Sequence, residues 1–172
     1  YFVSKLIKSI LFNFANSKNM PSQEEIKVLM EITRPSIPQT VEVIEKILHA
    51  VKTKHYTDAY KDLIALPETF NNEAGKRCVI VLDEFHVLED FPIDEVFQEM
   101  SNTIMTQKKC LYVIASSYPE IANRILAEKL TLLFGNFELI EVGGFDAKTA
   151  REFFVREISP VLASSYYTDY MH

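Results

Sequence analysis

A run of five apolar residues, 78–82, leads directly into two acidic residues, Asp83 and Glu84. The run is rich in β-branched side chains and has no polar interruption, which is typical of a strand buried on both faces of a parallel sheet. A second run of this kind spans residues 110–115 and ends in two serines, Ser116 and Ser117. The carboxyl ends of parallel strands meet at one edge of a sheet, where α/β proteins bind their ligands. The sequence therefore predicts a parallel sheet with polar side chains gathered at that edge.

Segments with a helical spacing of apolar residues alternate with these strands. Helices are predicted over residues 2–16, 22–30, 39–51, 57–70, 93–105, 119–126 and 146–158. Ser22 and Glu25 form a capping box, Asp146 caps the last helix, and residues 71–76 are expected to form a polar turn. A third apolar run, 137–142, predicts a further strand. Strands that alternate with helices indicate an α/β fold with a parallel sheet of about three strands.

The segment that leads into Asp83 and Glu84 has the form of a Walker B motif, four apolar residues followed by Asp-Glu. At the edge of the sheet, Asp83 can hold the water shell of Mg²⁺, a hard cation that prefers oxygen ligands and keeps several waters. Glu84 can polarise the water that attacks the γ-phosphate of ATP. The alternative is structural, because many buried strands end in an acidic residue that only caps the next helix.

Motifs follow one another along the chain in a distinctive order: VLDEFHVL at 81–88, YVIASS at 112–117, LFGNFE at 133–138, and GFD at 144–146 ahead of AREFF at 150–154. That order is similar to the archaeal ATPase family, a branch of the AAA+/STAND-like P-loop ATPases also found in bacteria. The resemblance covers residues 60–158 well and the N-terminal helices loosely. It implies a partial P-loop NTPase fold of the AAA+/ASCE type and an ATP- and Mg²⁺-dependent ATPase core, usually followed by a winged-helix domain.

The same resemblance gives a role to the two serines. Ser116 and Ser117 stand where AAA+ proteins have sensor 1, a polar residue that helps to orient the attacking water. The structural alternative is an N-cap for the helix that follows Pro119, and the two roles can coexist.

The chain departs from the family at the phosphate loop. It contains no G-x-x-x-x-G-K-[ST] motif and only four glycines. In AAA+ sheets the phosphate-loop strand lies between the sensor 1 strand and the last strand, so without it we expect exposed hydrophobic strand edges. Three explanations are open: the sequence is part of a longer chain, a partner supplies the strand, or the two flanking strands pair directly. The helical pattern of apolar residues is already present at Tyr1, so we favour the explanation that the sequence is part of a longer chain.

Further departures concern the residues that would sense the nucleotide. Many family members have Gly-Arg where this chain has Gly-Asn at Asn136, so Arg124 and Arg151 become alternative γ-phosphate sensors, although both also fit exposed helix positions. His86 follows the acidic pair where relatives often have Gln. It can relay the nucleotide state or act as a structural histidine.

Composition limits the partners. The formal net charge of −6 argues against a sequence-independent nucleic-acid surface, and Lys5, Lys8 and Lys18 fit a solvated helix face better than a basic patch. Cys78 and Cys110 open apolar runs, which predicts buried thiols in a reducing cytoplasm rather than metal ligands. No apolar run reaches the ~18 residues of a transmembrane helix, so no membrane partner is expected.

The 172 residues are expected to form a single partial ATPase domain. Residues 1–76 would be mainly helical, 77–158 would hold the Walker B and sensor 1 core, and 159–172 would begin a linker or C-terminal region. The predicted function is an ATP-binding and ATP-hydrolysing core fragment that is inactive alone, with a protein partner or an oligomer left open. The alternatives are a nucleotide-independent interaction or scaffold module and a DNA-acting helper ATPase, which the acidic charge supports weakly.

Overall fold

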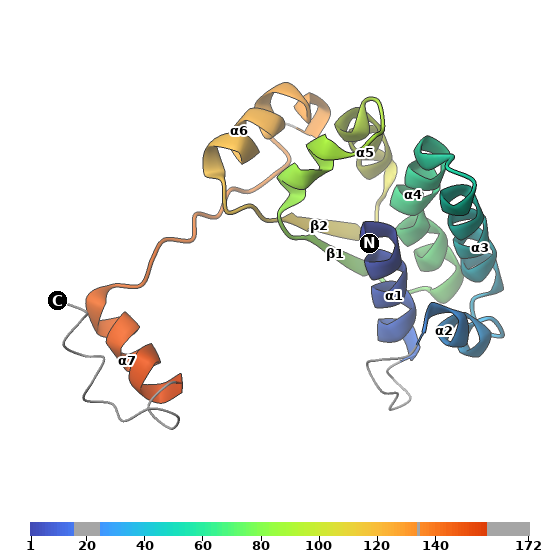
Figure 1. Cartoon of the computed structure of the whole chain (residues 1–172), viewed down its shortest axis with the longest axis horizontal. Coiled ribbons are helices and arrows are strands. Elements are labelled where there is room, and N and C mark those ends of the chain that lie inside the picture. Colours follow the sequence, from blue (N-terminus) through green and yellow to red (C-terminus); the bar gives the residue numbers. More distant parts are fainter. Residues whose placement is uncertain (16–24, 134, 158–172) are drawn as a thin grey trace. The chain divides into compact units, whose positions relative to one another are not determined.

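The computed structural model describes residues 1–15, 25–133 and 135–157 (Figure 1). The chain divides into two compact units, Tyr1–Asn136 and Phe137–His172. The elements of the first unit are α1 (Phe2–Ala15), α2 (Ile26–Thr33), α3 (Pro38–Lys52), α4 (Tyr56–Ala74), β1 (Cys78–Leu82), the 3-10 helix η2 (Phe85–Asp90), α5 (Val96–Thr106), β2 (Cys110–Ile114), α6 (Pro119–Glu128) and the 3-10 helix η3 (Thr131–Leu133). The described part of the second unit holds α7 (Ala147–Glu157).

The predicted helices form, with shifted ends. The capping box falls on Ser22, outside the described residues, and α2 begins directly after Glu25. The predicted turn at 71–76 is wrong at its start, because α4 continues to Ala74 and ends only at Gly75. Gly75 has a φ of +66°, a left-handed conformation that glycine adopts without the cost of a side chain, and this is a common way to end a helix.

Helices α3 and α4 lie side by side and form the main helical layer (Figure 1). The N-terminus of α3 is capped by a side chain from the far end of α4. Glu73 Oε1 accepts a hydrogen bond from the Gln39 backbone N–H at 2.7 Å. Glu73 Oε2 accepts one from the Thr40 backbone N–H at 2.7 Å and another from the Thr40 hydroxyl at 2.6 Å. The free amides that begin α3 are therefore satisfied from a neighbouring helix.

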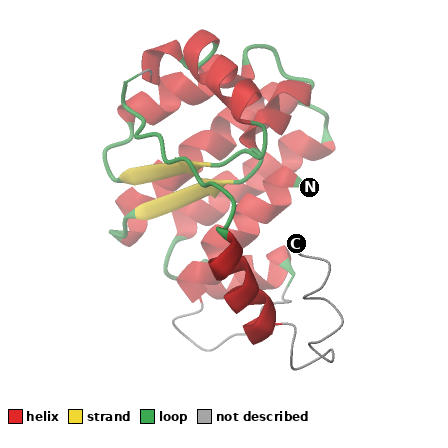
Figure 2. Ribbon diagram, turned by 90° about the vertical axis from the view of Figure 1, so that its left-hand side faces the viewer, coloured by secondary structure: helices red, strands yellow, loops and turns green. Residues whose placement is uncertain are grey.

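The two strands pair in parallel and in register, from Cys78 opposite Cys110 to Leu82 opposite Ile114 (Figure 2). One face of the sheet is covered. Cys78, Ile80 and Leu82 are buried on that face. At the start of the strands, the Cys78 thiol lies 3.7 Å from the Pro67 carbonyl oxygen of α4. This contact packs the start of β1 against α4.

The other face of the sheet is open, so the prediction of strands buried on both faces is wrong. Val79 and Val81 are 62% and 63% exposed, and Leu111 and Val113 on β2 are exposed beside them. Successive residues of a strand point to opposite faces, so a continuous apolar run buries only every second side chain when one layer of helices covers the sheet.

The predicted third strand is also absent. Residues 137–142 have no regular secondary structure, and Leu139 and Ile140 are 75% and 76% exposed. A strand is stable only when its backbone groups pair with a neighbour, and the described residues form one sheet of two strands, β1 and β2. The predicted cap of α7 is confirmed, since Asp146 Oδ1 accepts a hydrogen bond from the Thr149 backbone N–H at 2.8 Å.

Candidate functional site

The carboxyl ends of β1 and β2 bring the predicted site residues together. The ladder continues one step beyond the paired strands, because the Ala115 N–H donates to the Leu82 carbonyl at 2.9 Å and the Phe85 N–H donates to the Ala115 carbonyl at 3.1 Å. Residues 83–86 and 115–118 therefore lie next to each other at one edge of the sheet. This is the arrangement that the sequence predicts for a ligand-binding edge.

Asp83 is the first residue after β1, and its side chain is exposed. Its Oδ1 accepts a hydrogen bond from the backbone N–H of Glu84 at 3.1 Å. Glu84 has a φ of +50°, which is the left-handed region that non-glycine residues rarely occupy. Such backbone conformations gather at functional sites, although a tight turn also produces them.

The Glu84 carboxylate points across to the end of β2. Its Oε2 accepts a hydrogen bond from the Ser117 backbone N–H at 3.0 Å and lies 3.3 Å from His86 Nδ1. The hydrogen bonds from the backbone and the side chain of Ser117 hold the pKa of Glu84 below its usual value, and the nearby His86 acts in the same direction. This carboxylate is therefore ionised at neutral pH.

Ser116 lies within the same cluster. Its Oγ is 2.9 Å from His86 Nδ1 and accepts a hydrogen bond from the Tyr118 backbone N–H at 3.1 Å. The alternative role as an N-cap is not borne out for either serine, because Tyr118 occupies the N-cap position of α6 and no side chain caps that helix end. Both serines are left with their hydroxyls near the strand ends.

His86, for which the sequence left two roles open, lies in this cluster. It stands two residues after Glu84, where a turn returns its side chain to the cluster, and its ring packs edge-on against Tyr118 with centroids 5.1 Å apart. A Ser-His-Glu hydrolase triad is excluded, because such a triad places serine on one ring nitrogen and the carboxylate on the other. Here both Ser116 and Glu84 contact Nδ1.

The side chains of the cluster could hold Mg²⁺ only together with waters and phosphate oxygens. Among residues 1–15, 25–133 and 135–157, no group of three or more His, Cys, Asp or Glu side chains gathers to hold a metal. Proteins commonly hold Mg²⁺ through one or two carboxylates, with waters and substrate phosphates completing the shell. The exposed carboxylate of Asp83 suits that limited role.

Arg124 does not join the cluster. Arg124 makes a two-pronged ion pair with Glu89, at 3.1 and 2.8 Å, and Lys129 contacts the same carboxylate at 2.6 Å. These bonds raise the pKa of Arg124 and lower that of Glu89. Arg124 is therefore engaged in tying α6 to η2. Arg151 is exposed on α7 in the second unit, and the Asn136 backbone N–H donates to the Leu133 carbonyl at 2.9 Å.

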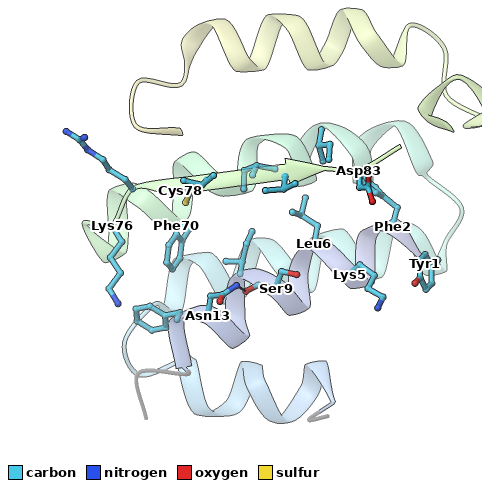
Figure 3. Close-up of a pocket in the computed structure, with 17 residues that line it drawn as sticks. Tyr1, Phe2, Lys5, Leu6, Ser9, Asn13, Phe70, Lys76, Cys78 and Asp83 are labelled. Atoms are coloured by element: carbon cyan, nitrogen blue, oxygen red, sulfur yellow. Dashed lines mark hydrogen bonds between the residues drawn. The ribbon is translucent and has the colours of Figure 1, made fainter. Parts of the chain in front are cut away.

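A groove lies elsewhere, between α1 and β1 (Figure 3). It has a volume of about 920 Å³ and is lined by every residue of β1 and by one face of α1. Asp83 stands at one end and Lys76 at the other (Figure 3). The groove meets the cluster only at Asp83, so it is not the site formed by Glu84 and the serines.

No family model, curated protein or solved structure matches the chain. Within the described residues, no helix has both the length and the apolar character needed to span a membrane.

Proposed function

We propose that this chain supplies the Walker B and sensor 1 half of an AAA+-type ATPase core, with Mg²⁺-ATP bound at the carboxyl edge of the sheet. The observation that supports it most directly is the hydrogen bond from the Ser117 N–H to Glu84 Oε2 at 3.0 Å. It joins the acidic pair to the polar end of the neighbouring parallel strand, which is the combination that ATP hydrolysis requires of this half.

Each residue then has a separate task. Asp83 would hold waters of the magnesium shell, and Mg²⁺ would supply positive charge that stabilises the phosphate oxygens. Glu84, which is ionised at neutral pH, accepts the proton of the attacking water. Ser116 and Ser117 orient that water and the phosphate through their hydroxyls.

The proposal requires a phosphate-binding loop that the 172 residues do not contain. We propose that this loop comes from sequence outside them. The chain as it stands should therefore release no phosphate from Mg²⁺-ATP above the buffer rate. If the 172-residue chain hydrolysed ATP and Glu84→Gln abolished that hydrolysis, the loop would not be required. The two unpaired thiols, Cys78 and Cys110, suit the reducing cytoplasm in which we place such a core.

The decisive experiment uses a product of the same gene that includes a G-x-x-x-x-G-K-[ST] loop. Glu84→Gln should lower kcat by ~100-fold or more, the usual loss when a general base is removed, and leave the Kd for ATP unchanged. Glu42→Gln, an exposed position on α3, is the matched control and should change neither.

The alternatives are outcomes of the same experiment. Loss of ATP binding in Glu84→Gln would give this residue a structural role. Absence of a phosphate loop from the gene, together with no ATP binding, would favour a nucleotide-independent scaffold module. Hydrolysis that depends on added DNA would favour a DNA-acting helper ATPase.

A further inference from the structure

His86 presents a single nitrogen to two oxygens. Nδ1 lies 2.9 Å from Ser116 Oγ and 3.3 Å from Glu84 Oε2. A neutral imidazole carries a proton on one nitrogen and a lone pair on the other. A lone pair on Nδ1 would face the negative charge of Glu84, whereas a proton there is attracted to it. The electrostatics therefore favour the tautomer with the proton on Nδ1.

That tautomer determines how Ser116 can bond. Its Oγ accepts from the His86 Nδ1–H and also from the Tyr118 backbone N–H at 3.1 Å. A serine hydroxyl has two lone pairs and one proton, so both acceptor positions are occupied. Only the hydroxyl proton is left to bond. Among the described residues it can reach the Tyr118 carbonyl at 3.4 Å, a distance beyond the usual range for such a bond.

We propose that His86 is a positioning residue that makes Ser116 an obligate hydrogen-bond donor toward an anionic oxygen at the carboxyl edge of the sheet. The T-shaped contact with Tyr118 keeps the imidazole in place. A hydroxyl that can only donate favours an anionic acceptor such as a phosphate oxygen and disfavours a cation or a donor. The identification of that anion as the γ-phosphate rests on the proposed function. The role of the Ser116 hydroxyl as a donor does not.

The first test measures the tautomer by ¹⁵N NMR of the imidazole in the whole nucleotide-free chain. In its neutral form, the imidazole of His86 should carry its proton on Nδ1 and show a pyridine-like Nε2. A proton on Nε2 alone would overturn the proposal. This measurement needs no nucleotide, so the tautomer prediction can fail while the ATPase proposal stands. The ATPase proposal can likewise fail while the tautomer is as expected.

The second test compares two variants that place an amide at different ring positions. The side-chain nitrogen of His86→Asn can occupy the place of Nδ1, whereas that of His86→Gln reaches the place of Nε2. Hydrogen exchange of the Ser117 and Tyr118 amides should accelerate by at least ~fivefold in His86→Gln, as expected for the loss of one ordinary hydrogen bond, and return toward the original rate in His86→Asn. Equal rates in the two variants would overturn the proposal.

Discussion

The carboxylate of Glu84 and the backbone N–H of Ser117 are joined at 3.0 Å although they lie 33 residues apart in the chain. Each residue follows a paired strand, and the register of β1 and β2 places the two strand ends at the same level. The hydrogen bond is thus a direct consequence of the parallel pairing, and it reports on the ionisation of the acid.

The first prediction is a pH dependence of this bond. Ser117 lowers the pKa of Glu84 below the ordinary value of 4.5, so the bond contributes fully above that pH and is lost as pH falls through the lower folded value. The chemical shift of the Ser117 amide should follow that titration and become flat in Glu84→Gln. A midpoint at or above the ordinary value would contradict the observed geometry.

The second prediction concerns the cap on α3. Partial burial of Glu73 pushes its pKa upward, but the hydrogen bonds from Thr40 and Gln39 outweigh it, and its pKa lies below the ordinary 4.5. Glu73→Gln should reduce the free energy of unfolding at pH 7 by ~1 kcal/mol, the usual value of a helix cap. The difference between the two proteins should shrink as pH falls below that ordinary value, because the carboxylate of the parent then becomes protonated.

The control for this cap is Glu42→Gln, which changes an exposed carboxylate on the same helix. Its free energy of unfolding, measured by urea denaturation, should stay within ~0.5 kcal/mol of the parent at both pH values. If Glu42→Gln destabilised the chain as much as Glu73→Gln, helix charge rather than capping would explain the loss.

The third prediction concerns the ion pair between Glu89 and Arg124. The pair is two-pronged and its acidic side chain is only 24% exposed, so Glu89 and Arg124 should show a measurable favourable coupling energy. A double-mutant cycle with Glu89→Gln and Arg124→Gln measures it at low salt, and the value should fall at high salt. The exposed pair of Lys148 and Glu152 at 3.9 Å should couple far more weakly.

The fourth prediction separates the two faces of β1. Val81→Lys adds a charge to the open face and should leave the free energy of unfolding within ~0.5 kcal/mol of the parent. It should also reduce concentration-dependent association, measured by light scattering, because exposed apolar strands promote it. Ile80→Lys, one residue earlier on the buried face, should prevent folding. Similar stability of the two variants would contradict the assignment of faces.

The sequence predicted a helix or strand well where the pattern of apolar residues within that segment determines its secondary structure. The helical spacing of Leu6, Ile10 and Leu11 predicts α1, and the run that ends at Leu82 predicts β1. The meeting of Glu84 with Ser117 also follows from the sequence, because two parallel strands joined by a helix must end at the same edge.

The remaining features depend on neighbours that a sequence pattern does not show. The number of layers over a sheet decides whether Val81 is buried, and a pairing partner decides whether residues 137–142 form a strand. The contact of His86 with both Glu84 and Ser116 depends on the left-handed backbone at Glu84, for which no glycine or asparagine gave a signal. A histidine two residues after the acidic pair is the one clue the sequence offered.

Because the strands pair in register, the cluster tolerates changes of length in the loops but not inside the strands. An extra residue in the connection between Asp90 and Val96 can be absorbed by a longer loop. One residue removed inside β2 would instead turn every later side chain of that strand to the opposite face and move Ser116 away from His86. Natural or engineered variation that preserves this cluster should therefore keep both strand lengths fixed while the helices between them vary.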